Sequence, residues 1–294
     1  MVTVTLFIER KPGCTGLFFA PQCSMPELPE VETSRRGIAP HIIDRAVQNV
    51  IVRNRNLRWP VSRSVDRNLC GAVITAVERR AKYLLIKTSA GAAILHLGMS
   101  GSVYIVDQGT PAGIHDHVDI ELNSGKLLRF RDPRRFGSLH WSRNPLQHKL
   151  LKSLGPEPLG DEFDGEYLWK RSRSRRVSVK QFIMNAQVVV GVGNIYASEA
   201  LFLAGIHPRR AAGRISQTRY ETLSAAIQDV LTEAIDAGGT TLRDFYGGDG
   251  ESGYFQQQLE VYGRDGEACR YCGTPITAIV QGQRSTFYCK HCQT

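Results

Sequence analysis

The residues with the clearest capacity for chemistry are Pro26 and Glu27, at the start of the Pro- and Glu-rich residues 25–32. If Met25 were the first residue and were removed, Pro26 would carry a free secondary amine, whose pKa lies nearer neutrality than that of a lysine. Such an amine keeps a neutral fraction that can attack an electrophilic carbon. The adjacent carboxyl of Glu27 would be placed for proton transfer. In the printed chain the Pro26 nitrogen is an amide without a nucleophilic lone pair. We therefore expect residues 1–24 to be an extension that the mature protein lacks.

A second chemical signature lies at the C-terminus, where two Cys-x₂-Cys pairs are separated by sixteen residues: Cys269, Cys272, Cys289 and Cys292. Each pair places two thiolates on one tight turn, and two such turns form a tetrahedral Cys₄ site. Four protein ligands leave no open position, so the sequence predicts one structural Zn²⁺ rather than a catalytic one. The other three cysteines are scattered, which fits a reducing intracellular compartment better than a disulfide framework.

The composition is that of a basic globular protein. The chain has 294 residues, 42% of them hydrophobic, and a formal net charge of +9. Residues 1–24 contribute only Glu9, Arg10 and Lys11 to this charge, so the basic character belongs to the body of the chain, as in nucleic-acid-binding proteins. No apolar run is long enough to span a bilayer, and residues 1–24 lack the order of charge and apolar stretch found in a secretory signal.

The elements that must position these residues fall into two groups. A helix is expected over residues 29–40, because Pro29 suits the first turn of a helix. Short strands with turn signals between them follow, at residues 50–52, 73–77, 83–87, 93–97, 103–106, 118–122 and 127–130. Beyond a linker at residues 155–158 the apolar spacing becomes helical, at residues 165–171, 179–185, 194–204 and 217–237.

These patterns predict an α+β multidomain protein. We expect a catalytic β-sandwich domain with flanking helices over residues 25–154. A helical domain is expected over residues 155–258, including a Gly-rich loop near its end. A zinc-finger hairpin is expected over residues 259–294.

The start at residues 25–32, together with the motifs below, resembles the formamidopyrimidine-DNA glycosylases, the bacterial Fpg or MutM enzymes. The likeness extends from about Met25 to the C-terminus. It implies a bifunctional base-excision-repair enzyme, a DNA glycosylase and AP lyase that removes 8-oxoguanine and formamidopyrimidines. It also implies Schiff-base chemistry at Pro26 with β,δ-elimination, in which Glu27 assists opening of the sugar ring. The implied partner is double-stranded DNA that contains oxidised purines or abasic sites. We further expect a monomer in the bacterial cytoplasm, associated with the nucleoid and not with a membrane.

Two further residues have catalytic roles in the family. Lys82 follows a basic pair and precedes apolar residues, so it could reach a cleft or remain a surface lysine. The matching family lysine binds phosphate beside the damaged nucleotide and assists catalysis. Arg284 lies between the two cysteine pairs, where a zinc-bound hairpin could direct it at DNA. The family arginine at this place contacts the lesion site and assists the second elimination.

A nucleotide that is swung out of the stack leaves a void that costs stacking energy, and apolar and guanidinium side chains are its physical filler. Met99, Arg134 and Phe136 match the three void-filling residues of the family. Without the resemblance, the sequence pattern would favour a core position for Met99 and a place on a strand for the Phe136 ring over a void-filling role.

The remaining DNA contacts come from the family pattern and from a basic stretch. His115 matches a phosphate contact, and alternation along its strand argues against a second metal site there. Asn194, after Gly191-Val192-Gly193, matches the phosphate-binding asparagine of a helix–two-turn–helix, and glycines before a helix start suit phosphate. Arg175 stands where the family often has a lysine, and an arginine keeps the charge with a different geometry. Lys180 belongs to the same basic stretch. Residues 239–254 match the lesion-capping loop.

Three alternatives remain open. An enzyme of the related endonuclease VIII type would prefer oxidised pyrimidines, although Leu28 and residues 132–137 favour the purine branch. A non-catalytic DNA-binding paralogue would result if residues 1–24 were retained. A generic zinc-ribbon adaptor would leave Pro26, Glu27 and the long β domain unexplained.

Overall fold

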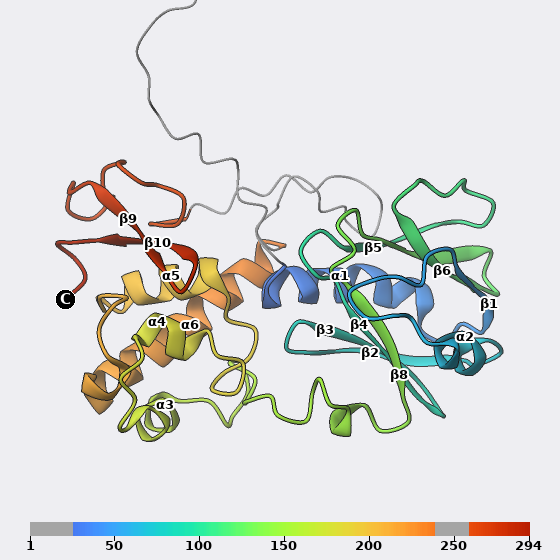
Figure 1. Ribbon diagram of the computed structural model, residues 1–294, viewed down its shortest axis with the longest axis horizontal. Coiled ribbons are helices and arrows are strands. Elements are labelled where there is room, and N and C mark those ends of the chain that lie inside the picture. Colours follow the sequence, from blue (N-terminus) through green and yellow to red (C-terminus); the bar gives the residue numbers. More distant parts are fainter. Residues whose placement is uncertain (1–25, 239–258) are drawn as a thin grey trace, which may run out of the picture.

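The computed structural model describes residues 26–238 and 259–294. The expected extension and the expected capping loop lie outside these residues. The described chain forms a sandwich of two antiparallel sheets and a helical half that carries a β-hairpin, as Figure 1 shows on its right and left sides. The predicted fold class is therefore confirmed, whereas the domain boundaries stay predictions.

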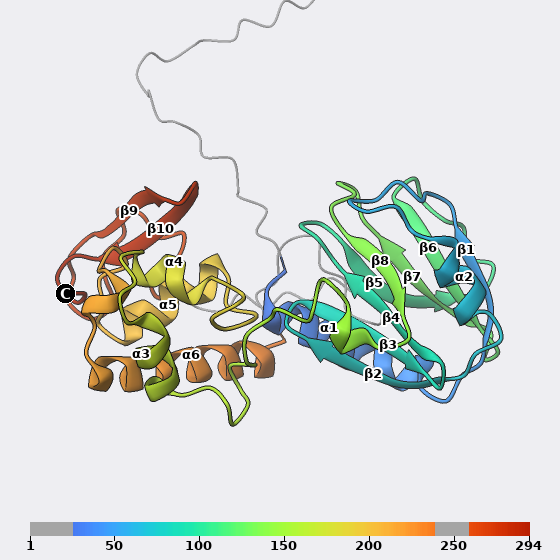
Figure 2. The same cartoon turned by 60° about the horizontal axis from the view of Figure 1, so that its bottom comes forward.

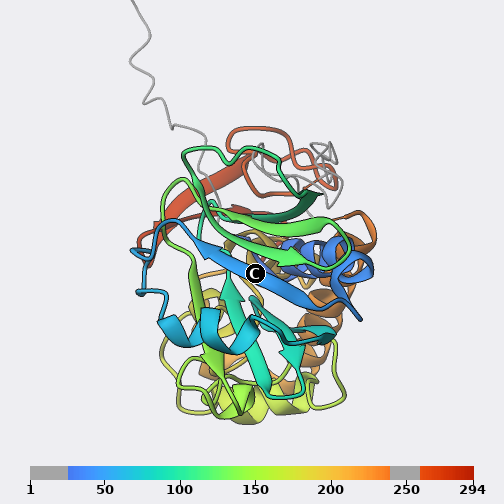
Figure 3. The ribbon, with the colours of Figure 1, turned by 90° about the vertical axis from the view of Figure 1, so that its right-hand side faces the viewer.

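The sandwich is built from two four-stranded sheets, and Figure 3 views the molecule from the side of the sandwich. The strand orders are β1-β6-β7-β5 and β2-β3-β4-β8. Its core is formed by alternate apolar side chains of both sheets, such as Leu84, Ile86, Leu95 and Phe130, as expected for face-to-face packing. The strands are β1 Val47–Val52, β2 Ile74–Arg80, β3 Tyr83–Thr88, β4 Gly91–His96, β5 Ser102–Asp107, β6 Asp116–Leu122, β7 Lys126–Arg131 and β8 Ser138–Ser142.

One helix of the sandwich was not expected from the sequence, namely α2, Arg63–Leu69. It is only seven residues long, too short for a clear helical repeat. Its N-terminal signal is Ser62, whose side chain accepts a hydrogen bond from the Ser64 N–H. Val65 and Leu69 are fully buried in the sandwich core.

Helix α1, Leu28–Ile42, connects the two halves of the molecule. Leu28 packs in the core of the helical half, whereas Val31, Ile38 and Ile42 pack in the core of the sandwich. Figure 2 shows α1 running from the junction into the sandwich. Because the helix begins in one core and ends in the other, the residues just before it, Pro26 and Glu27, lie at the junction.

The helical half consists of α3 to α6, with α5 and α6 packed together at its centre. Helix α6 is the long helix expected from apolar spacing, and Tyr220, Leu223, Ile227 and Leu231 on it are buried. Ser178 and Ser216 cap α4 and α6 through their side chains. The bounds are α3 Gly165–Ser172, α4 Val179–Ile183, α5 Asn194–Leu203 and α6 Gln217–Asp236.

The C-terminal hairpin pairs β9, Ile276–Gln281, with β10, Arg284–Cys289. Its two turn residues, Gly282 and Gln283, both have positive φ angles, 57° and 60°, as in the tight turns that join antiparallel strands. A small core that includes Val261, Ile276 and Cys289 packs the hairpin against Phe202 of α5.

A buried charge network corrects one expectation at β6. Alternation was expected to place both aspartates of residues 115–119 on the face opposite the histidines, but Asp119 lies two residues after His117, so strict alternation puts only Asp116 there. A register shift between Asp116 and Val118 changes the pattern further. Asp119 accepts two hydrogen bonds from Arg129, at 2.9 and 2.8 Å, and Asp116 lies 3.6 Å from the same guanidinium. His117 instead contacts the Asp132 carbonyl oxygen at 2.8 Å through its Nε2.

Among the helices of residues 26–238 and 259–294, none combines the length and the apolar character that a bilayer span requires.

We predict that Leu84→Ala lowers the free energy of unfolding by about 2–5 kcal/mol, because it removes a fully buried side chain from the sandwich core. The matched control is Leu146→Ala, at a leucine that is 57% exposed, where the change should stay within about 0.5 kcal/mol. Urea denaturation of both variants measures the difference. Equal effects at the two positions would contradict this assignment of the core.

Candidate active site

The main concave site is a cavity of about 990 Å³ lined by residues from both halves of the molecule. Among its described lining residues, five cationic side chains face the single carboxylate of Glu27: Arg58, Lys82, Arg134, Arg135 and Arg284. Such an excess of positive charge in a cleft attracts a polyanion such as a nucleic-acid backbone.

Glu27 is fixed by the start of helix α5. Its Oε2 accepts a hydrogen bond from the Gly193 N–H at 2.8 Å, and its Oε1 accepts one from the Ile195 N–H at 3.1 Å. The residue is only 3% exposed. The glycine turn before Asn194 and the first turn of α5 therefore give two N–H groups to Glu27. In this structure these groups are not available to a phosphate, contrary to what the glycine pattern suggested.

A second carboxylate holds the beginning of α1. Glu30 accepts hydrogen bonds from the Glu27 N–H at 2.8 Å and from the Tyr196 hydroxyl at 2.7 Å. The first of these completes a capping interaction at the helix N-terminus. Because Tyr196 belongs to α5, both Glu27 and Glu30 attach α1 to the same helix. The buried Pro26 directly precedes this arrangement.

Lys82 lies in the tight turn between β2 and β3, directly after Ala81, which has a φ of 55°. The carboxylate of Glu157, in the linker between the halves, accepts hydrogen bonds from Arg79 at 2.6 Å, from Arg80 at 2.7 Å and from the Ala81 N–H at 2.7 Å. No local pattern indicated this contact, because its partners are far apart along the chain. It holds the backbone next to Lys82 in place.

Burial shifts the pKa values of Glu27 and Lys82 toward their neutral forms. The pKa of Glu27 is raised, first by burial and then by Glu30, although Lys82 and the two N–H donors oppose the shift. The pKa of Lys82 is lowered, first by burial and also by Arg284, against the influence of Glu27 and Glu30. Relative to exposed groups, the carboxyl is thus shifted toward holding a proton and the amine toward losing one.

The three residues expected to fill a void in DNA lie together on the sandwich side of the cavity. Met99 comes from the loop after β4, and Arg134 and Phe136 come from the loop after β7. The Arg134 guanidinium carbon lies 5.1 Å from the centre of the Phe136 ring, which is a cation–π geometry. The structure therefore brings together side chains from two loops that are separated in sequence by three strands.

Asn194 and Arg284 line the opposite side of the cavity. The Asn194 side chain donates from Nδ2 to the Ser285 carbonyl oxygen at 2.9 Å. Its Oδ1 is buried and has no hydrogen-bond partner among the described residues. The Nδ2 contact joins the start of α5 to the zinc-finger hairpin, directly beside Arg284.

Three expected DNA-binding residues are not part of the cavity lining. Lys180 is only 2% exposed, and its Nζ donates to the Thr286 hydroxyl at 2.9 Å and to the Ser285 carbonyl oxygen at 3.4 Å. Arg175 is exposed in the loop after α3. His115 is partly exposed, and its carbonyl oxygen accepts from the Asp132 N–H at 3.0 Å. DNA contact by these residues stays a prediction.

The structure adds cavity residues that sequence reasoning missed: Arg58, Arg135, Tyr262, Gln283 and Ser285. Arg135 adjoins Arg134 and could have been included with it. Tyr262 has no pattern signal, because its place in the site depends on the packing of its ring against Phe287, at 5.0 Å between ring centres. Arg58 lies in an irregular segment that has no periodicity.

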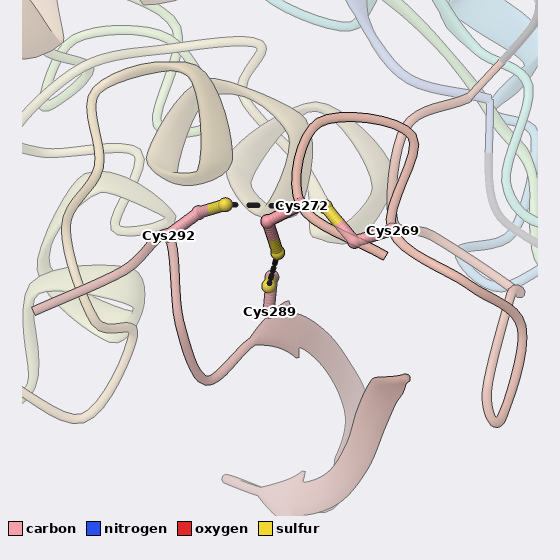
Figure 4. Close-up of side chains that lie close together, drawn as sticks. All are labelled: Cys269, Cys272, Cys289 and Cys292. Atoms are coloured by element: carbon pink, nitrogen blue, oxygen red, sulfur yellow. Dashed lines mark hydrogen bonds between the residues drawn. The ribbon is translucent and has the colours of Figure 1, made fainter. Parts of the chain in front are cut away.

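The four cysteines of the C-terminal module converge, as Figure 4 shows. Their Sγ atoms all lie within 4.8 Å of one another. Cys269 and Cys292 are 3.9 Å apart and Cys272 and Cys289 are 3.5 Å apart, sulfur to sulfur. A zinc ion with Zn–S bonds of about 2.3 Å sets its sulfurs roughly 3.8 Å apart. The cluster therefore has the dimensions of a closed Cys₄ zinc site.

Family models match three consecutive parts of the chain. Residues 25–139 match the formamidopyrimidine-DNA glycosylase N-terminal domain. Residues 154–246 match the H2TH domain of the same enzymes, and residues 266–294 match a zinc finger found in FPG and IleRS. With this match, the four cysteines are identified as the ligands of one zinc ion.

Individual relatives agree with the family models. The formamidopyrimidine-DNA glycosylase of Stutzerimonas stutzeri is 60% identical over 269 residues, which are 92% of this chain and 100% of the relative. A Pseudomonas aeruginosa protein of the same name has the same identity and coverage.

Solved structures show the same similarity in three dimensions. Lactococcus lactis Fpg in complex with DNA containing an abasic site matches with a TM-score of 0.83 and 30% identity, over 91% of this chain and 99% of that one. The MutM (Fpg) protein from Thermus thermophilus matches with a TM-score of 0.81 and 35% identity, over 91% and 98%.

We predict that Gly193→Ala destabilises the protein, because a Cβ at this position would overlap the Glu27 carboxyl. The carboxyl would then lose its N–H partners, and a buried polar group left without a partner costs about 1–3 kcal/mol. The control is Gly160→Ala, where the nearest atom lies 3.5 Å from the added carbon. Denaturant unfolding should distinguish the two, and a neutral Gly193→Ala would show that Glu27 is not held here.

We predict that Cys289→Ser lowers the zinc content well below one ion per chain and that amide exchange of residues 276–289 accelerates, because metal binding and folding of a small zinc module are coupled. Cys70→Ser changes an exposed cysteine outside the cluster and should keep one zinc. Elemental analysis and hydrogen exchange measure both effects. Full zinc content in Cys289→Ser would refute the assigned ligand set.

Proposed function

The chain belongs to the formamidopyrimidine-DNA glycosylase family, and we propose that it removes oxidised purines from DNA with the Pro26 amine as its nucleophile. The observation that carries the proposal is Glu27, a buried carboxyl with a raised pKa, adjacent to Pro26 and at the edge of a strongly basic cavity. A proton donor beside an amine nucleophile is what cleavage of a glycosidic bond at a sugar carbon requires.

In the proposed reaction, the lone pair of the Pro26 nitrogen forms a bond to C1′ of the damaged nucleotide. The bond from C1′ to the base breaks, and the base leaves with the electron pair and takes up, directly or through solvent, the proton that the Pro26 nitrogen loses. Glu27 donates its proton to the sugar ring oxygen as the C1′–O4′ bond breaks, which leaves an iminium ion between Pro26 and C1′. The positive charge acidifies the C2′ proton, so the 3′ phosphate leaves by β-elimination. The 5′ phosphate then leaves by δ-elimination.

The protonation preferences of the site support these roles. Burial raises the pKa of Glu27, which shifts this carboxyl toward the protonated form that could supply the proton for ring opening. Burial lowers the pKa of Lys82, which shifts this amine toward the neutral form that could accept a proton in the same cavity. Arg284 supplies fixed positive charge at the far wall for the departing phosphates.

The substrate class follows from the relatives. One solved MutM structure holds DNA with carbocyclic 8-oxo-G, and a Lactococcus lactis Fpg structure holds DNA with Fapy-dG. We infer the same oxidised purines, and abasic sites, in double-stranded DNA for this chain. The protein would act as a monomer on the bacterial nucleoid, in the cytoplasm.

The proposed DNA contacts divide by side of the cavity. Met99, Arg134 and Phe136 would fill the space left by the everted nucleotide. Asn194 would bind phosphate. His115 and Arg175 would add contacts outside the cavity. Lys180, whose amine is buried, would contribute indirectly by supporting the hairpin.

The proposed chemistry depends on the removal of the expected extension, residues 1–24. If the extension persists, Pro26 remains an amide and the chain becomes a DNA-binding protein without this chemistry. The N-terminal mass of protein isolated from its own cells discriminates the two. A mass beginning at Pro26 supports the enzyme, and one beginning at Met1 or Val2 supports the binder.

We predict that the form starting at Met25, with the methionine removed, is trapped by borohydride as a covalent complex with abasic-site DNA and with 8-oxoguanine DNA. One residue added before Pro26 should abolish trapping, because it converts the nucleophile into an amide. Pro26→Gly should keep part of the trapping, because a primary amine remains. Denaturing electrophoresis with labelled DNA measures the complex.

The same assay separates the alternatives. Trapping that survives the added residue would assign the nucleophile to Lys82 or another amine. Faster excision of thymine glycol than of 8-oxoguanine would place the chain with the endonuclease VIII type instead.

A further inference from the structure

The two loops that carry the void-filling residues meet on one buried carboxylate. Asp132 is 0% exposed. Its Oδ1 accepts a hydrogen bond from the Ser100 hydroxyl at 2.8 Å, and its Oδ2 accepts one from the Gly137 N–H at 2.7 Å. Ser100 directly follows Met99, and Gly137 directly follows Phe136. One side chain therefore fixes the backbone beside both side chains.

Ser100 also connects its own loop to the loop that carries Arg134. Its hydroxyl oxygen accepts a hydrogen bond from the Arg134 N–H at 3.1 Å while it donates to Asp132. The Ser100 hydroxyl thus bonds both to the buried Asp132 carboxylate and to the backbone of Arg134, whose side chain lines the cavity. An apolar side chain in its place would leave a buried carboxylate oxygen and an N–H without this partner.

Close backbone contact supports the same picture. Gly98 has a φ of 73°, and a Cβ there would overlap the backbone of Phe136 and Gly137. A Cβ at Gly137 would lie 2.6 Å from the Phe130 ring and 3.0 Å from Asp132 Oδ2. The glycines allow the loops to touch, and the hydrogen bonds of Asp132 and Ser100 determine how they touch.

We infer that Ser100 and Asp132 are positioning residues that join the two loops into one rigid unit, so that Met99, Arg134 and Phe136 enter DNA together. This inference rests on the proposed function. Filling a void in the duplex requires three side chains in a fixed arrangement, and ordering them separately at each encounter would cost conformational entropy. In a preformed unit the three side chains are already ordered before DNA binds, so this entropy is not lost at each encounter.

The inference predicts a selective defect in Ser100→Ala. Excision of 8-oxoguanine from duplex DNA, measured in a single turnover, should slow by about tenfold or more, the factor that corresponds to a lost hydrogen bond in a buried network. The fluorescence rise of a 2-aminopurine next to the lesion, which reports unstacking, should slow equally. Borohydride trapping on an abasic site in single-stranded DNA needs no void filling and should stay within about twofold of the parent.

Matched variants control the experiment, all in the form starting at Met25. Ser100→Thr retains the hydroxyl and should restore duplex excision. Ser124→Ala, in the exposed turn before β7, should behave as the parent. Met99→Ala should be slow on duplex DNA, and adding Ser100→Ala to it should cost little more, because residues that act as one unit are non-additive.

Each contrary outcome is decisive. A Ser100→Ala protein with parental duplex excision, or with single-strand trapping reduced as much as duplex excision, would overturn the inference. Full additivity with Met99→Ala would also overturn it. A parent that traps on abasic DNA neither as a duplex nor as a single strand would instead remove the proposed function, and with it the premise of the inference.

Discussion

The arrangement depends on the burial of one carboxylate. Glu27 can remain in the interior because helix α5 and the turn before it offer two N–H groups, from Ile195 and Gly193. A buried carboxyl without such donors would be costly, and the same N–H groups would otherwise be unsatisfied at the helix start. The Glu27 carboxyl and the N–H groups at the start of α5 therefore satisfy each other, and this pairing fixes the beginning of α1 between the two halves of the protein.

That constraint explains why one helix belongs to two cores. Leu28 packs against the helical half at Gly191, where a side chain would overlap it, and Val31 begins the contacts with the sandwich. The Glu157 carboxylate adds a second connection, from the linker to the turn that carries Lys82. The cavity walls are thus held relative to each other at two places, and Glu27 and Lys82 influence each other's pKa.

Local pattern in the sequence was enough to predict several parts of the structure. The cysteine spacing predicted the Cys₄ cluster, alternation predicted most strands of the sandwich, and apolar spacing predicted the long helix α6. Contacts between segments that are far apart in the sequence could not be predicted from local pattern. Nothing in the Gly-x-Gly turn indicated that its N–H groups bind Glu27 rather than phosphate. A run of basic residues likewise gave no indication that Lys180 turns inward.

The inward turn of Lys180 has a structural reason in the hairpin. Strand β10 begins with Arg284 directly after the tight turn, at the opposite end of the strand from the zinc ligand Cys289. The loop end therefore needs support of its own, and Lys180 and Asn194 both provide it by binding the Ser285 carbonyl oxygen. Burial lowers the pKa of Lys180 to about 7, so this support has a cost in desolvation. A mobile Arg284 would lose its fixed direction into the cavity, which makes the buried lysine part of how the hairpin presents that charge.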